Sequence, residues 1–276
     1  MGQSGIGGRG SCLWRVALMA GTVLGVGMVS AVPRALGQEQ AEKMMAADVH
    51  PSYEVATIKP SDPEDQSSGF EMDGRQLFIE NQSVESMIAA AYGVHPKQIV
   101  DAPDWSTKER WNVKGVPDEP GTPSWPQYQE MIQKLLAERF GLKFHRDKRD
   151  LSIFAITVTK GGPKLAVSKS DPNSVRDQTA NGNGVEVTYR FTNNSIADFA
   201  DGMRSFLDRP VVDETGIKGK FDFVLQWTKD GAVNSDPNAP PGLFTAVQEQ
   251  LGLKIEPTKG PAEVLVIETV ERPSAN

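Results

Sequence analysis

The sequence predicts an α+β protein with largely antiparallel sheets, built from two tandem copies of one unit of about a hundred residues. Two observations favour this fold class. Short motifs recur in one order at a nearly fixed offset, and strand and helix patterns follow each other without the regular βαβ order of a parallel sheet. The chain of 276 residues, with 38% hydrophobic and 24% charged residues, is large enough to bury the required core.

The internal repeat rests on four matched blocks. Asn81 and Ser83 recur as Asn193 and Ser195, each 112 residues further along the chain. The later blocks match Ile99-Val100-Asp101 with Val211-Val212-Asp213, Trp111-Asn112-Val113 with Phe221-Asp222-Phe223, and Phe140-Gly141-Leu142-Lys143-Phe144 with Leu251-Gly252-Leu253-Lys254-Ile255. Four matches in the same order indicate a duplication, although they say nothing about chemistry.

Each copy is predicted to have the element order β-α-β-β-α-β-β. The first copy has a strand at 76–80, a helix from 84, strands at 98–100 and 110–115, a helix at 125–140, and closing strands at 142–146 and 152–158. The second has a strand at 186–192, a helix from 196, strands at 210–212 and 220–227, a helix at 243–251, and closing strands at 253–257 and 264–270. Ser83 and Ser195 are expected to be helix N-caps, a structural role. An extra strand at 53–58 precedes the first copy.

The first 37 residues have the pattern of a secretory signal peptide. Arg9 and Arg15 precede an uncharged apolar stretch at 16–32, and small residues precede the expected cleavage after Gly37 or, as a second choice, after Ala31. An uncleaved membrane anchor is the alternative, but the stretch is at the short end of the roughly 17–25 residues that span a bilayer. We therefore expect an exported protein, periplasmic or extracellular, without a stable membrane span after cleavage.

The remaining chain divides by composition. We expect a flexible segment at 38–51, the first repeat at 52–163, a linker loop at 164–184, the second repeat at 185–273 and a tail at 274–276. Stretches rich in Pro, Asp, Asn, Ser and Gly at 59–69, 162–184 and 229–241 are expected to be surface loops.

The net charge and the cysteine content limit the kinds of partner and ligand that we expect. Without residues 1–37 the chain keeps 26 basic and 36 acidic side chains, a net charge of −10. Nucleic acid is not an expected partner, because its phosphates require a clustered basic face. The single cysteine, Cys12, lies in the signal segment, so the mature chain has neither a disulfide nor a cysteine metal ligand.

Motifs of catalysis and cofactor binding are absent from the sequence. It contains no G-x-S-x-G, no H-E-x-x-H and no Gly-rich phosphate loop, and the acidic loops at 62–65 and 101–104 lack EF-hand spacing. We therefore predict no catalytic residue, no metal site and no cofactor.

Five residues are candidates for binding: Asp101, Asp104, Trp105, His145 and Asp213. Asp101 and Asp213 occupy the same place in both copies and could form a carboxylate pair across a two-fold axis, although turn formation explains them more simply. Trp105, like Trp125, could stack on a ligand. His145 is expected to point outward from its strand into solvent.

Segments along almost the whole chain resemble an uncharacterised family of exported soil-bacterial proteins that is abundant in acidobacteria and whose shared domain is called DUF3738. The segment Tyr53–Pro60 resembles the FEVASIKP element that opens this family. Similar segments follow at 91–94, 103–105, 135–146, 160–165, 209–213, 219–223 and 260–267. The resemblance covers residues 52–273 and implies export, but no catalytic residues.

A more distant likeness concerns the fold alone. A strand that leads through Asn-x-Ser into a helix, followed by a short strand and a turn, looks like the small N-terminal modules of secretins and TonB-dependent receptors. Such modules bind other proteins in the periplasm.

These observations favour an exported binding module of the cell envelope over an enzyme. Its partner would be an envelope or extracellular protein or peptide, held at sheet edges or long loops. One alternative is a hydrolase of envelope or extracellular polymers, with Asp101, Asp104, His145 and Asp213 as first suspects. Another is a binder of small molecules in a groove between the two copies.

Overall fold

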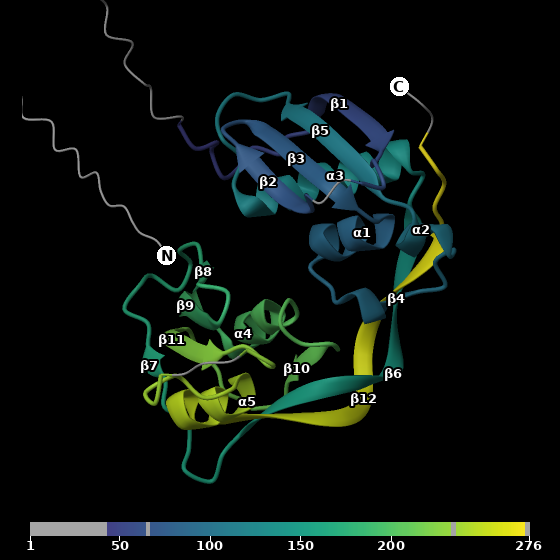
Figure 1. The fold of residues 1–276 in the computed structure, drawn as a ribbon. Coiled ribbons are helices and arrows are strands. Elements are labelled where there is room, and N and C mark those ends of the chain that lie inside the picture. The colour runs from purple at the N-terminus through teal and green to yellow at the C-terminus, as the bar shows by residue number, and fades with distance from the viewer. Residues whose placement is uncertain (1–42, 65–66, 233–235, 274–276) are drawn as a thin grey trace, which may run out of the picture. The chain divides into compact units, whose positions relative to one another are not determined.

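The described part of the chain forms three four-stranded sheets (Figure 1). The structure, a computed structural model, describes residues 43–64, 67–232 and 236–273. Most strand pairs in these residues are antiparallel, which confirms the predicted α+β class. The expected signal peptide at 1–37 and tail at 274–276 lie outside the described residues. Within those residues, no helix has the length and apolar character that a membrane span requires.

The first sheet and two helices form the N-terminal half. Its strand order is β1 (Tyr53–Pro60), β5 (Trp111–Pro117), β3 (Gln76–Gln82) and β2 (Gly69–Asp73). Helices α1 (Val84–Tyr92) and α3 (Trp125–Arg139) bury Met87, Ile88, Met131 and Ile132 against Leu77, Ile79 and Val113 of the sheet. The predicted strands at 53–58, 76–80 and 110–115 and the helices from 84 and at 125–140 are present, and β2 is an additional strand.

The C-terminal half repeats this arrangement around a second sheet. Its order is β7 (Ala166–Val167), β11 (Phe221–Thr228), β9 (Glu186–Asn194) and β8 (Asp177–Gly182). Helix α4 (Ile196–Met203) and helix α5 (Leu243–Ala246), which continues as a π-helix at Val247–Leu251, pack on it. The segment 164–184, predicted to be a loop, therefore holds two strands. Each strand has a counterpart at the same place in the first sheet, and the duplication itself stays a prediction.

Two long strands form the third sheet with short partners at its edges. The strands β6 (Lys143–Val158) and β12 (Leu253–Thr269) pair along their whole length and run side by side in Figure 1. Parallel partners at the two edges are β10 (Val211–Asp213) beside β6 and β4 (Ile99–Val100) beside β12. The prediction of two separate closing strands in each copy is therefore wrong. The polar residues between them continue the ladder instead of turning, since Lys148 pairs with Glu263.

The long pair exchanges strand ends between the two cores. Leu265 and Ile267 near the end of β12 are buried in the core of the N-terminal half, where they face the first residues of β6. Phe154 and Ile156 of β6 are buried in the core of the C-terminal half. Each core is therefore completed by a strand from the other half of the sequence.

A shared backbone feature stands before the first helix of each half. Asn81 and Asn193 both have positive φ, 50° and 58°, a conformation that asparagine tolerates better than most residues. The backbone N–H of Asn81 donates to Oδ1 of Asn112 at 2.7 Å, and the backbone N–H of Asn193 donates to Oδ1 of Asp222 at 2.8 Å. In both halves, the same backbone conformation and the same kind of hydrogen bond therefore connect the end of a strand to the following helix.

Serine hydroxyls then begin both helices. Ser83 Oγ accepts from the amide of Ser86 at 3.0 Å at the start of α1. Ser195 Oγ accepts from the amide of Asp198 at 3.1 Å at the start of α4, and the Asp198 carboxylate accepts from the Ser195 amide in return. This reciprocal capping box satisfies amides that helix ends leave without partners.

Residues 43–51, part of the segment expected to be flexible, pack on α3. Met45 is buried, and its amide donates to the carbonyl of Thr122 at 2.8 Å. Gln127 donates to the carbonyls of Ala46 and Val49, at 2.8 and 2.9 Å. These bonds fix the entry of the chain beside the N-terminal half.

The exchanged strand ends predict reciprocal mutational effects. Leu265→Ala removes a fully buried side chain and is expected to cost about 2–5 kcal/mol of stability. Native-state hydrogen exchange should speed up mainly at residues 77–136, although Leu265 is distant from them in sequence. Ile156→Ala, also fully buried, should instead speed up exchange at residues 187–255. If each variant loosened only its own half of the sequence, the exchange would be contradicted.

Candidate functional site

Asp101 and Asp213 do not form a carboxylate pair. Asp101 follows β4 and Asp213 ends β10, and these strands lie at opposite edges of one four-stranded sheet. They also pair with different parts of the β6–β12 ribbon, because Val212 lies beside Ala155 whereas Val100 lies beside Val266, which pairs with His145. The two carboxyl groups therefore cannot share a proton. Asp101, with φ of 62°, accepts from Arg149 at 3.1 Å, whereas Asp213 accepts from the amide of Thr215 at 2.9 Å. The Asp213 side chain therefore organises a turn, whereas the Asp101 side chain pairs with Arg149 of β6.

Asp104 and Trp105 begin the short helix α2 (Trp105–Lys108) and are already engaged. The Asp104 carboxylate lies 2.7 Å from Nζ of Lys108, and this ion pair lowers its pKa. The guanidinium of Arg272 lies 4.9 Å from the centre of the Trp105 ring and also binds Glu109 through two nitrogens. The Trp105 face expected to stack on a ligand is thus covered by the chain itself.

His145 lies on β6 and contacts a carboxylate. Its Nδ1 is 2.8 Å from Oε1 of Glu268, and about half of each side chain is exposed to solvent. Glu268 and Asp101 line a shallow cavity of about 350 Å³. Solvent competes for such exposed pairs, so this contact does not provide the water-excluded environment on which acid–base catalysis depends.

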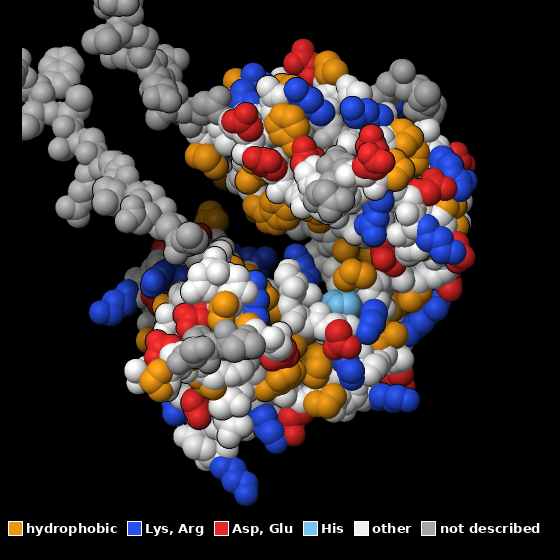
Figure 2. All heavy atoms as spheres, viewed as in Figure 1, with side chains coloured by type: hydrophobic (Ala, Val, Ile, Leu, Met, Phe, Trp, Pro, Cys, Tyr) orange, Lys and Arg blue, Asp and Glu red, His pale blue; other side chains and the backbone are white. Residues whose placement is uncertain are grey.

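A larger polar cleft brings together elements of both halves. It has a volume of about 670 Å³, which is within the range of ligand-binding cavities. One wall comes from the end of α1 and one face of α3, and the other comes from β8, β9 and the end of α4. The surface is hollowed where these elements meet, and basic side chains lie in the hollow (Figure 2). We call this feature the polar cleft.

The cleft walls combine aromatic and polar side chains. Tyr92, Trp125 and Tyr189 supply rings, and Trp125 keeps 40% of its surface exposed while its ring edge packs on Phe70. The polar residues are Gln129, Gln133, Gln178, Arg176, Asp177, Asp201, Arg204 and Ser205. Rings beside amides and a guanidinium suit a ligand that has both apolar groups and hydrogen-bonding groups.

Arg204 is the most distinctive group in the polar cleft. Its side chain is partly buried, and burial lowers its pKa. No carboxylate oxygen of the described residues lies within 4.0 Å of its guanidinium, and no described acceptor takes a hydrogen bond from it. Asp201 is the nearby carboxylate whose charge acts on Arg204, but the two groups form no ion pair within 4.0 Å. A partly desolvated guanidinium that makes no ion pair favours an anionic ligand.

A charge network stabilises the wall behind Arg204. Asp198 of α4 binds Nζ of Lys220 at 2.8 Å and pairs with Arg176. Burial alone would raise the pKa of Asp198, but bonds from Lys220 and Ser195 and the charge of Arg176 lower it to about 2. The network uses the charge of Arg176 within the protein, which leaves Arg204 as the available cation.

His95 connects the two walls near the end of α1. Its buried ring accepts the amide of Lys97 at Nδ1, 3.0 Å away, and Nε2 therefore donates to the carbonyl of Leu207 at 3.3 Å. Burial lowers the pKa of His95, and the Lys97 and Arg204 charges act in the same direction, against the Leu207 bond and Asp208. The neutral imidazole of His95 is thus the form that makes the hydrogen bond between the two walls of the cleft.

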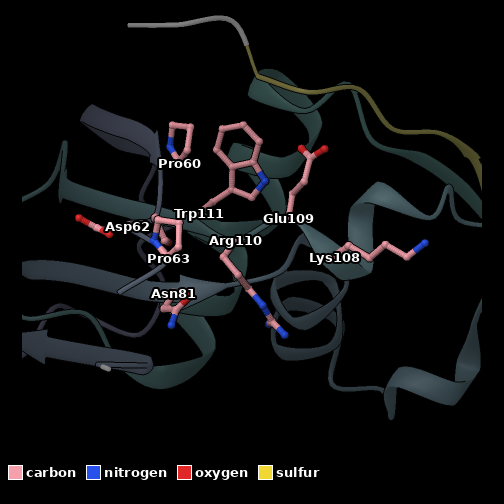
Figure 3. Close-up of a pocket in the computed structure, with 9 residues that line it drawn as sticks. Pro60, Asp62, Pro63, Asn81, Lys108, Glu109, Arg110 and Trp111 are labelled. Atoms are coloured by element: carbon pink, nitrogen blue, oxygen red, sulfur yellow. The ribbon is translucent and has the colours of Figure 1, made fainter. Parts of the chain in front are cut away.

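A second cavity of about 390 Å³ lies at the edge of the first sheet (Figure 3). The Trp111 ring lies between Pro60 and Glu109, and the Arg110 side chain extends away from the ring. Glu109 is bound by Arg272, and Trp111 packs edge-on against Phe140 with ring centres 6.0 Å apart. Its lining combines the rings of Pro60, Pro63 and Trp111 with polar and charged side chains. It is smaller than the polar cleft, and the carboxylate of Glu109 already has a cationic partner, so it offers less for recognition.

Sequence reasoning identified only one residue of the polar cleft, Trp125. Arg204, Gln129 and Gln133 are common helix residues, and nothing in the sequence distinguishes them from solvated ones. Among the residues that the structure describes, no cluster of three or more His, Cys, Asp or Glu side chains is placed to hold a metal ion.

The fold defines an α+β protein with two strand-exchanged cores and a polar cleft. The chain belongs to the family described as a protein of unknown function (DUF3738), whose model matches residues 85–270. The family resemblance noted from the sequence is thereby confirmed. No curated protein and no solved structure matches the chain.

The Asp198 network predicts a loss of stability in acid. Because the folded-state pKa is depressed, the stabilisation is present above the ordinary pKa of aspartate and disappears as pH falls towards 2. Asp198→Asn should cost about 2 kcal/mol at pH 7. Urea denaturation should show this difference at pH 7 and almost none near pH 2, whereas Asp230→Asn should change little at either pH. A difference independent of pH would contradict this role.

His95 predicts a second pH dependence, at higher pH. Its folded-state pKa is lowered, so the unfolded chain takes up protons first and stability should fall as pH drops below about 6.5. His95→Asn keeps an acceptor for the Lys97 amide but cannot be protonated. Denaturation midpoints between pH 8 and 5 should therefore change less in this variant than in the wild type or His50→Asn. Equal slopes would count against a neutral His95.

Proposed function

We propose that the protein is an exported, non-catalytic binding module and that its polar cleft binds a short peptide or a peptide segment of an envelope or extracellular protein. The partly buried Arg204, which forms no ion pair within 4.0 Å with the described residues, is the observation that carries this proposal. Export is supported by the signal-peptide pattern at 1–37.

The chemistry of the cleft favours binding over catalysis. The suspects for a hydrolase, Asp101, Asp104, His145 and Asp213, do not line the polar cleft, and each has its own partner elsewhere. A purely apolar small molecule would leave the amides and the guanidinium of the cleft without partners, which is costly. A peptide offers donors, acceptors and apolar side chains together.

Occlusion of the cleft tests this function. Ser205 is exposed and lines the cleft, so Ser205→Trp fills the space without removing a buried side chain. The purified protein should retain members of a random tetrapeptide to hexapeptide library, measured by equilibrium dialysis and mass spectrometry. Ser205→Trp should weaken retention at least tenfold, whereas Ser170→Trp, at an exposed serine outside the cleft, should not. Equal retention by both variants, or no retention by the wild type, would refute the proposal.

A further inference from the structure

Gly93, at the end of helix α1, lies near both Arg204 and the side-chain amide of Gln129. A methyl group at Gly93 would lie 3.2 Å from Nη1 of Arg204 and 4.0 Å from Nε2 of Gln129. Gly93 also has φ of 65°, so a larger residue there would strain the backbone as well as meet the guanidinium. The glycine therefore leaves free the space that borders both the guanidinium and the amide.

Gln129 and Gln133 each present a hydrogen-bond acceptor to the polar cleft. Their Nε2 atoms donate to the carbonyls of Ala90 and Ala91, both at 2.8 Å, which fixes the two amides. Their Oε1 atoms take no hydrogen bond from the residues that the structure describes. Each fixed amide thus keeps an acceptor at the cleft wall.

The spacing of these acceptors matches an extended peptide. Residues four apart on a helix lie about 5–6 Å from each other on one face. In an extended chain, the N–H groups that point to one side recur every second residue, about 6.6 Å apart. Two successive outward N–H groups of a peptide could therefore bind Gln129 and Gln133 together.

We propose that Arg204 binds the C-terminal carboxylate of an extended peptide whose following N–H groups, read from its C-terminus, bind Gln129 and Gln133. This inference rests on the proposed function and names its ligand class. A guanidinium binds a carboxylate through two parallel N–H bonds, which gives both strength and direction. The rings of Tyr92, Trp125 and Tyr189 provide contact for side chains of the peptide.

Two features of the cleft limit the choice of ligand. Asp201, one helical turn before Arg204, adds a negative charge nearby and disfavours ligands with several anionic groups. An acidic sugar could also supply one carboxylate, but its hydroxyl groups have no regular repeat that matches the two glutamine acceptors. A peptide with a single terminal carboxylate satisfies both conditions.

The test compares one peptide library in two chemical forms. N-acetylated pentapeptides with a free C-terminal carboxylate and the same peptides with a C-terminal amide are each dialysed against the wild-type protein. We expect the free-acid form to bind at least tenfold more tightly. Amidation changes only the ligand, so this comparison holds even if a protein variant fails to fold.

Variants then assign the effect to Arg204. Arg204→Gln should abolish the preference for the free acid, and Arg204→Lys should retain part of it, because lysine keeps the charge but not the bidentate geometry. Arg190→Gln, an exposed residue on the other face of β9, should leave the preference unchanged. Hydrogen exchange of α4 confirms that the variants are folded.

The outcomes separate this inference from the proposed function. Equal binding of acid and amide, blocked by Ser205→Trp, would overturn the carboxylate site while the peptide-binding function stands. Binding of neither library would overturn both. Binding of an oligoglucuronate that depends on Arg204, without peptide binding, would also overturn the peptide assignment.

Discussion

The antiparallel pairing of β6 with β12 is the interaction on which the rest of the fold depends. It extends from the Lys143–Thr269 pair to the Val158–Leu253 pair, and each end of the ribbon carries apolar side chains of a different core. Because the paired strands are separated by about a hundred residues, much of the chain must be ordered before either core is complete. Each half therefore needs residues from the other half of the sequence to complete its own core.

The same pairing explains how ordinary residues can form a binding site. The ribbon and the His95–Leu207 bond connect the elements that carry the two walls of the polar cleft. The Asp198 network then fixes α4, and bonds to the end of α1 fix the two glutamine amides of α3. Recognition groups that are held before a ligand arrives lose less conformational entropy on binding.

Local sequence patterns predict many of the helices and strands. They do not predict which strands pair with each other. The alternation from Phe221 to Trp227 identified β11, because one face of that strand is buried. β8, with the polar sequence Asp177–Gly182, has little strand propensity and forms because β9 offers an edge. The tripeptide Ser-Asp-Pro at 61–63 recurs at 170–172, after β7, and would have indicated that the second copy begins earlier. Arg204 gave no such signal, since the burial of its side chain and the absence of an ion pair are visible only in three dimensions.

The exchanged strand ends also constrain how this chain can evolve. Residues buried in one core are encoded in the other half, so a change of volume near Leu77 is compensated most directly near Leu265. Recombination that replaced one half with that of a distant relative would join each core to a foreign closing strand. Inheritance of the two halves as a matched pair follows from this geometry, even though each half has its own sheet and helices.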